Sequence, residues 1–253
     1  MAHNSVNLAV VPAYNEEATV ARVVENIHCW APDFDVVVVD DGSTDETGRR
    51  AVAAGASVVR LPFNCGIGGA VQAGFVYARE NGYERMVQID GDGQHDAREL
   101  HKLVEALDAN PSADVICGSR FLSEDYRYPA PISRRTGIHI FAFLLSRITG
   151  QPVSDPTSGF RLYNRRAIGL FAGDYPHDYP EVEAVLMLHH HRLTLREIPV
   201  VMHERGGGES SISSGKSVYY MIKVLLALFV SLLRRRPVPL PGDKAPVALE
   251  HGI

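Results

Sequence analysis

Two short acidic runs, each closing a burst of apolar residues, constrain the fold of this chain more than any other feature. Asp40-Asp41 follows the apolar run 36–39, and Asp90-Gly91-Asp92 follows the run 86–89. Each pattern predicts a buried strand with carboxylates at its C-terminal end. In an open α/β sheet the ligand crevice lies outside the carboxyl ends of the strands, so we expect these side chains to line one pocket.

Segments typical of strands and helices alternate along the chain. The expected strands cover residues 8–11, 36–39, 57–61, 86–89, 114–118, 159–164 and 194–201. The expected helices cover 18–29, 46–54, a stretch from about 70 to 81, then 97–110, 133–149 and 181–191. Such alternation predicts an α/β fold with a mostly parallel sheet and right-handed crossovers.

The composition fits one domain with a tail. The chain has 253 residues, 45% of them hydrophobic, which is enough for one sizeable core. We predict a single domain over residues 1–233, including an apolar helix at 218–233, and a disordered basic, proline-rich tail at 234–253. The net charge of −5 gives no case for a nucleic-acid partner. Three scattered cysteines favour a reducing, cytoplasmic compartment.

The apolar helix expected at 218–233 suggests a membrane surface as a partner. At about 1.5 Å per residue it would be roughly 24 Å long, which is short for a hydrocarbon core of about 30 Å. Arg234-Arg235-Arg236 follows it directly, and basic residues beside an apolar helix meet anionic headgroups. We therefore expect peripheral attachment to the cytoplasmic, inner face of the membrane, and a homo-oligomer is possible.

Five motifs occur in the order and spacing of glycosyltransferase family 2. They are residues 11–17 (VPAYNEE), 39–45 (VDDGSTD), 64–70 (NCGIGGA), 90–94 (DGDGQ) and 118–121 (GSRF). Over about residues 8–233 the chain most resembles the branch of that family containing the dolichyl-phosphate and polyprenyl-phosphate sugar synthases. The resemblance implies a GT-A fold, which is a Rossmann-like, mostly parallel sheet flanked by helices, with a nucleotide-sugar site at the C-terminal edge of the sheet.

The resemblance also implies where a nucleotide-sugar donor would bind. Asp41 would accept a hydrogen bond from the base, and a buried acceptor of that kind rejects bases that lack the N–H. The residues bordering the base, ribose and diphosphate would be Pro12, Ala13, Tyr14, Glu16, Gly66, Asp90 and Gly91. The alternative for Asp41 and its neighbours is an ordinary strand-to-helix turn.

A divalent cation is the cofactor that the resemblance implies. Asp92 and Gln94 would bind Mg²⁺ or Mn²⁺, and Asp90 would contact the metal or the ribose. A leaving nucleoside diphosphate gains negative charge that such a cation can stabilise. Taken alone, this acidic run also fits a plain surface turn.

Four arginines are the candidates for holding an anionic acceptor. By resemblance, Arg120 and Arg205 would grip the acceptor phosphate and the donor diphosphate, and Arg134 or Arg135 would add to the grip on the lipid phosphate. Guanidinium groups bind phosphate bidentately, which suits two anionic substrates in one site. The alternative is a solvated basic face.

The acceptor itself stays open between two classes. A polyprenyl phosphate is already a nucleophilic anion, whereas a hydroxyl acceptor needs a general base, for which Glu181 is the candidate. We therefore predict a metal-dependent inverting transferase of UDP- or GDP-sugars, a hexosyltransferase, with Asp92, Arg120, Arg205 and Glu181 as its catalytic set. A nucleotide-sugar-binding domain without turnover is the non-enzymatic alternative.

Histidines offer little further metal chemistry. Three consecutive histidines at 189–191 point about 100° apart on a helix, so they cannot converge on one ion. His203 lies nearer the predicted site, yet we expect a structural role for it. The polar, glycine-rich segment 206–215 is either a lid over the donor or a linker.

Overall fold

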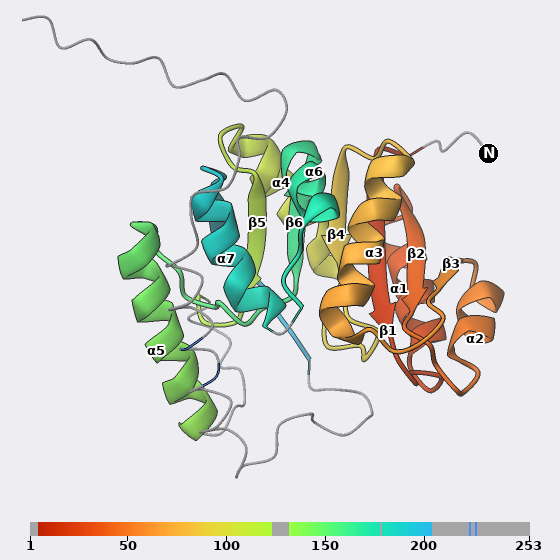
Figure 1. The fold of residues 1–253 in the computed structure, drawn as a ribbon. Helices are drawn as coiled ribbons and strands as arrows, with labels where there is room; N and C mark the ends of the chain where they lie inside the picture. The colour runs from red at the N-terminus through yellow and green to blue at the C-terminus, as the bar shows by residue number, and fades with distance from the viewer. Residues whose placement is uncertain (1–4, 123–131, 178, 204–222, 224–225, 227–253) are drawn as a thin grey trace, which may run out of the picture.

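The computed structural model describes residues 5–122, 132–177, 179–203, 223 and 226, with only the backbone of 132–135 (Figure 1). Its strands are β1 (Asn7–Ala13), β2 (Phe34–Asp40), β3 (Ser57–Arg60), β4 (Arg85–Gln88), β5 (Val115–Ser119), β6 (Arg161–Asn164) and β7 (Leu195–Pro199). Its helices are α1 (Val20–Trp30), α2 (Thr47–Ala53), α3 (Gly66–Glu80), the 3₁₀ turn η1 (Ala97–Glu99), α4 (Leu100–Ala109), α5 (Ile132–Thr149), α6 (Arg165–Gly173) and α7 (Pro180–His190).

The seven strands form one sheet in the order β3-β2-β1-β4-β6-β5-β7. All neighbouring pairs are parallel except those of β6, which runs antiparallel to β4 and β5. The predicted mostly parallel α/β sheet is therefore confirmed. The chain order reverses between β1 and β4, which places a topological switch point in the middle of the sheet.

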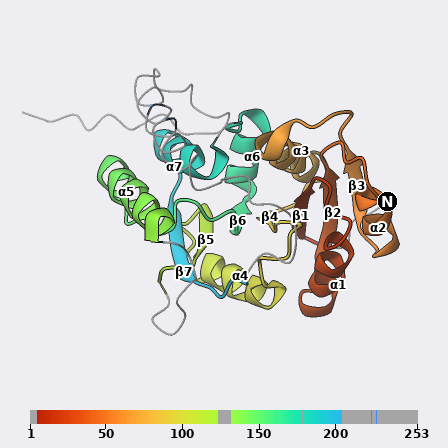
Figure 2. The same ribbon diagram turned by 90° about the horizontal axis from the view of Figure 1, so that it is seen from below.

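Helices cover both faces of the sheet, as the view from below shows (Figure 2). One face packs against α3, α6 and α7, and the other against α1 and α4. The central strand β1 is buried along its whole length and alternates between the two cores, with Val10 on the α3 side and Val11 on the α1 side. Such continuous apolar runs are typical of strands covered on both faces.

Helix α3 lies so close to β1 that it requires a glycine at the contact. A Cβ on Gly74 would lie 2.3 Å from Cγ1 of Val10, which is well inside van der Waals contact. This close approach holds the middle of α3 against the centre of the sheet. In the glycine run itself, a Cβ on Gly68 would lie 2.5 Å from the carbonyl oxygen of Pro176, so that glycine also allows a close packing contact.

Two elements differ from the sequence-based expectation. Helix α6 was not expected, because it follows β6 without a loop, and the only local signal is Asn164, whose side chain caps the helix by accepting from the Ala167 amide. The helix expected from residue 97 begins as the 3₁₀ turn η1, since Asp96 accepts from the Arg98 amide and tightens the first turn.

The C-terminal expectations fall on residues that the structure does not describe. The apolar helix at 218–233, apart from residues 223 and 226, and the tail at 234–253 lie outside the described residues, so the single-domain boundaries stay a prediction. Within the part that is described, no helix is both long and apolar enough to cross a bilayer.

Candidate active site

The carboxyl ends of three neighbouring strands bring the predicted donor residues together. β1 lies between β2 and β4, so Pro12 and Ala13 end β1 between the acidic runs that follow the other two strands. β5 runs parallel to β4 with β6 between them, and therefore brings Ser119 and Arg120 to the same edge. Four segments far apart in the sequence thus lie along one edge of the sheet.

Asp41 joins the end of β2 to the glycine-rich loop. Its buried carboxylate accepts from the backbone N–H of Cys65 at 2.7 Å and from that of Gly66 at 2.9 Å. Gly66 has φ +80°, a left-handed conformation that favours glycine, and it begins α3. The neighbouring Asp40 is structural, since it accepts from the Ser43 amide within its own turn.

The loop after β1 is tied to the loop after β4 through one hydroxyl. Thr19 Oγ1 lies 2.7 Å from the carbonyl oxygen of Gly91 and 2.9 Å from Oε2 of Glu16, so both oxygens share this group. Tyr14, in contrast, is 46% exposed and presents its ring at the surface of the same loop. The Thr19 bridge holds the predicted base and diphosphate loops at a fixed spacing.

Asp90 is oriented by a buried histidine. The Asp90 amide donates to Nδ1 of His95 at 3.1 Å, which leaves the ring proton on Nε2, 3.7 Å from Oδ2 of Asp90. The ring of His95 stacks on Phe160 with 4.8 Å between centroids, and Gln88 donates to Oδ1 of Asp90. This carboxylate therefore has a fixed direction at the edge of the sheet.

The described side chains of the acidic loop after β4 do not complete a cation site by themselves. Asp92 is buried and Oδ1 accepts from the Gln94 amide at 2.9 Å. Within the described ranges, no three His, Cys, Asp or Glu side chains gather as ligands for one ion. Mg²⁺ is commonly held by one or two carboxylates plus substrate phosphates, and Asp90 with Asp92 fits that pattern.

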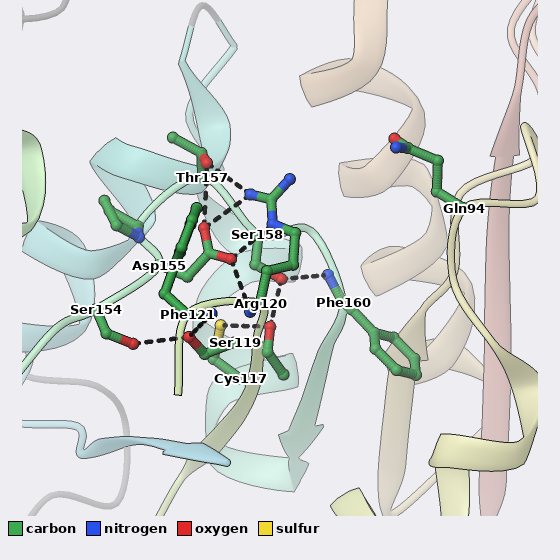
Figure 3. Close-up of polar contacts among 12 residues, drawn as sticks. Gln94, Cys117, Ser119, Arg120, Phe121, Ser154, Asp155, Thr157, Ser158 and Phe160 are labelled. Atoms are coloured by element: carbon green, nitrogen blue, oxygen red, sulfur yellow. Dashed lines mark hydrogen bonds and ion pairs between the residues drawn. The ribbon is translucent and has the colours of Figure 1, made fainter. Parts of the chain in front are cut away.

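Arg120 is held by a buried ion pair (Figure 3). Its Nε and Nη2 donate to the two oxygens of Asp155 at 2.7 and 2.8 Å, and Nη2 also donates to Thr157. Asp155 is fully buried and Arg120 is 5% exposed. Gln94 extends toward this network from the loop on the other side of the site (Figure 3). The guanidinium is therefore held in one position. A phosphate could contact it only in that position.

A carboxylate on the edge strand supports this ion pair from behind. Glu197 on β7 accepts from the amides of Ser154 and Asp155 and from the Ser154 hydroxyl. Asp155, Thr157 and Glu197 did not stand out in the sequence, because nothing in their local pattern distinguishes them from loop and strand residues. The possible signal was the run of polar residues between two apolar stretches at 154–158.

Arg161 is a second buried arginine. Unlike Arg120, it was not predicted from the sequence. It is 1% exposed at the start of β6, and Nη2 donates to the carbonyl oxygens of Pro156 and Glu181. It therefore joins the loop that holds Arg120 to the first turn of α7. Its Nε and Nη1 have no hydrogen-bond partner, a costly arrangement for a buried cation.

Glu181, the candidate base, lies in the first turn of α7 and is half-buried. Burial raises the pKa of its carboxyl above the usual value, the charge of Arg161 opposes the rise, and that of Asp90 adds to it. Arg120 also acts on this group through its charge. Glu181 is therefore close enough to Asp90 and Arg120 for their charges to affect its pKa.

His203 has the structural role that the sequence favoured. Nε2 lies 2.9 Å from Oδ2 of Asp96, and the His203 amide donates to the carbonyl oxygen of Gln94. The histidine run ends α7 at His190, as expected from its helix-end pattern. These contacts brace the loop after β4 from the side of β7.

The remaining arginines are only partly placed. Arg134 and Arg135 lie in the first turn of α5, and their side chains are outside the described part of the chain. Arg205 and the segment 206–215 also lie outside the described residues. The roles expected for Arg134, Arg135 and Arg205 therefore stay predictions.

Carboxylates that follow the strands on both sides of a topological switch point, with a buried arginine at the same edge of the sheet, are the architecture of a nucleotide-sugar transferase of the GT-A type. The chain belongs to glycosyltransferase family 2, whose family model matches residues 8–170. It is therefore a glycosyltransferase, as predicted.

Two curated relatives cover most of the chain. The polyprenol monophosphomannose synthase of Mycolicibacterium smegmatis is 30% identical over 230 residues, which are 86% of this chain and 84% of that protein. The undecaprenyl-phosphate mannosyltransferase of Micrococcus luteus is 33% identical over 217 residues, 82% of this chain and 88% of that protein. The predicted branch of the family is confirmed by these relatives.

A solved structure supports the fold. Glucosyl-3-phosphoglycerate synthase from Mycobacterium tuberculosis, crystallised with Mn²⁺, UDP and glucosyl-3-phosphoglycerate, is similar with a TM-score of 0.68. The sequence identity is 23%, and the similarity covers 94% of this chain and 82% of that one. At this identity the likeness bears on the fold, and the predicted GT-A arrangement is confirmed.

Proposed function

We propose that this glycosyltransferase moves a sugar from a UDP- or GDP-sugar to a polyprenyl phosphate with the help of Mg²⁺ or Mn²⁺. The names of the two curated relatives support a lipid-phosphate acceptor. Asp41 and the loop after β1 would take the base and ribose, and Asp90, Asp92 and Gln94 would hold the cation. When bound, the cation would stabilise the charge of the departing diphosphate.

The observation that carries this proposal is the placement of Arg120 opposite the acidic loop. Gln94 of the acidic loop lies across from the Arg120 guanidinium, which Asp155 holds in place (Figure 3). A phosphate acceptor is itself the nucleophile, so the chain's residues need to orient it and need no proton acceptor. Asp155 holds the Arg120 guanidinium in one orientation, so an acceptor phosphate that reaches it would be bound in a defined direction.

Helix α5 supports attachment to a membrane surface. Ile140 and Phe143 are 41% and 66% exposed on one stripe of the helix, and Arg147 continues the same stripe. Figure 1 shows α5 at one end of the molecule beside α7. An exposed apolar stripe with a basic end is typical of helices that lie on bilayers. We therefore propose peripheral attachment at the cytoplasmic face.

A hydroxyl acceptor is the second candidate, because of Glu181. Its pKa is raised by burial and it lies within reach of the charges of Asp90 and Arg120, which suits a general base. In this case Glu181 would take the proton of the attacking hydroxyl. The two candidates differ only in the acceptor half of the site.

A matched pair of acceptors tests the proposal. The purified protein is given a labelled UDP- or GDP-sugar and Mn²⁺ with vesicles containing either a polyprenyl phosphate or the corresponding polyprenol. We expect label in the lipid fraction with the phosphate only. Transfer to the polyprenol, or to neither lipid while a soluble hydroxyl is glycosylated, would contradict the proposal.

A further inference from the structure

A cavity of about 480 Å³ lies beside the loop after β4, on the side of the sheet covered by α1. Its floor is apolar and is formed by Val23, Ile27 and Ile89. The polar and aromatic residues of its walls are Arg22, Asn26 and Trp30 from α1 and His95, Asp96, Arg98 and His203 from the opposite side. Neither Asp41 nor Asp92 lines it, and its volume is within the usual range for small-molecule sites.

The only carboxylate among the lining residues is fully engaged. Arg98 donates to both oxygens of Asp96, and His203 lies 2.9 Å from Oδ2. Arg98 therefore balances the charge of Asp96 through direct contacts with both of its oxygens.

Arg22 carries the charge that remains. Within the described part of the chain it makes no hydrogen bond or ion pair. Its Nη2 would lie 3.4 Å from a Cβ on Gly93, so the guanidinium reaches the wall formed by the acidic loop. Among the charged residues that line the cavity, Asp96 and Arg98 balance each other, and Arg22 has no carboxylate partner in the lining. Arginine in such a setting favours phosphate because its planar fork matches the oxygens.

Trp30 adds a flat wall to the same cavity. It is 51% exposed, and the Arg98 guanidinium lies 6.0 Å from its ring centre. Arg22, Asn26 and Trp30 are spaced four residues apart on α1, so their side chains share one face of the helix. A ligand whose phosphate binds Arg22 would therefore lie along the helix face that also carries the indole of Trp30.

We propose that this cavity is a second ligand site, for a small organic phosphate with a sugar-sized body. The phosphate would bind Arg22, and the body would pack against Trp30 with Asn26 as a hydrogen-bonding group. The site lies next to the acidic loop and is separate from the residues assigned to the donor. This inference does not depend on the identity of the sugar acceptor.

The tryptophan makes the site directly measurable, because Trp30 is the only tryptophan of the chain. Intrinsic fluorescence of the full chain is titrated with glucose 1-phosphate, inorganic phosphate and glucose at constant ionic strength. We expect a saturable change with glucose 1-phosphate, weaker binding of inorganic phosphate and no response to glucose. Excess UDP or GDP with Mn²⁺ should leave the titration unchanged.

Two variants and a matched control locate the binding. Arg22→Gln should weaken glucose 1-phosphate binding at least tenfold, which is about 1.4 kcal/mol. Asn26→Asp, which adds a negative charge to the same wall, should weaken it in the same direction. Arg79→Gln is the control, since Arg79 is exposed on α3, pairs with the adjacent Glu80 and carries the same charge as Arg22.

Several results would overturn the proposal. Absence of a saturable change, or equal weakening in the Arg22 and Arg79 variants, would exclude a specific site. Displacement by a nucleoside diphosphate with Mn²⁺ would assign the binding to the donor site instead. Equal affinities for inorganic phosphate and glucose 1-phosphate would contradict the contact with Trp30. Thermal unfolding of each variant verifies that it is folded.

Discussion

The proposed donor and acceptor halves of the site are built from different interactions. In the donor half, carboxylates bind backbone N–H groups of nearby loops, as Asp41 does with Cys65 and Gly66. In the acceptor half, the buried Arg120 and the buried Asp155 form an ion pair. Glu197, on the neighbouring strand β7, accepts a hydrogen bond from the Asp155 amide. The donor half therefore depends on loop geometry, whereas the acceptor half depends on a charge pair that must stay complete.

The largest effect should come from the charge of the acidic loop. Asp92→Asn keeps the shape of the side chain but removes its charge, so we expect sugar transfer to fall by about 1,000-fold, the scale of losing electrostatic stabilisation of a leaving group. Steady-state kinetics with Mn²⁺ measures this. Asp174→Asn, at an exposed position after α6, should stay near wild-type activity.

Metal removal examines the same half of the site without a mutation. A chelator should abolish transfer by the wild-type protein, and excess Mn²⁺ or Mg²⁺ should restore it. Full activity in the presence of the chelator would contradict a cation-dependent reaction. An unchanged Mn²⁺-dependent affinity of Asp92→Asn for UDP and GDP would contradict the assignment of the cation to the acidic loop.

The buried ion pair of the acceptor half should dominate stability. Asp155→Asn leaves the Arg120 guanidinium buried without its counter-charge, so we expect the free energy of unfolding to fall by about 3–5 kcal/mol in denaturant titrations. Asp108→Asn breaks the exposed pair with Arg85 and should cost less than about 1 kcal/mol. Similar losses of unfolding free energy in both variants would mean that the buried ion pair contributes no more to stability than the exposed one.

Phe143 tests whether α5 lies on a membrane surface. Phe143→Ser should weaken binding to vesicles with anionic lipids about tenfold, because a side chain of this size gains about 1.5–3 kcal/mol from full burial and inserts only partly. Co-sedimentation measures the bound fraction. Phe63→Ser is the matched control, since Phe63 is 67% exposed in the loop before α3. If both variants lose binding equally, α5 is not the contact.

Glu181 should give the smallest effect and separates the two acceptors. A carboxyl whose pKa is raised on folding stabilises the protein at low pH, and that contribution is lost as the pH rises through the raised pKa. Glu181→Gln should therefore melt at a higher temperature than wild type at neutral pH, and at the same temperature as wild type in acid.

The same variant reports on catalysis. With a phosphate acceptor, Glu181→Gln should keep most of its activity, because no proton has to be removed. A loss of about 100-fold or more would instead assign Glu181 as the base for a hydroxyl acceptor. Stability and activity measured on one preparation distinguish a folding defect from a catalytic one.

The sequence predicted correctly those residues that directly follow the C-terminal end of a strand. The runs after β2 and β4 predicted carboxylates at one edge of a parallel sheet, and the family motifs named their neighbours. The direction of β6 and the helix α6 were not readable, because both depend on which strands pair rather than on local pattern. Asp155, Arg161 and Glu197 were missed for the same reason, since each acts through contacts between distant segments.

One competition experiment tests the central claim most directly. The protein, a labelled donor and Mn²⁺ are mixed with equal amounts of a polyprenyl phosphate in vesicles and 3-phosphoglycerate in solution, and both products are quantified by mass spectrometry. The account predicts a polyprenyl-phosphate sugar and essentially no glycosylated glycerate. A product that is mainly glycosylated 3-phosphoglycerate would contradict it.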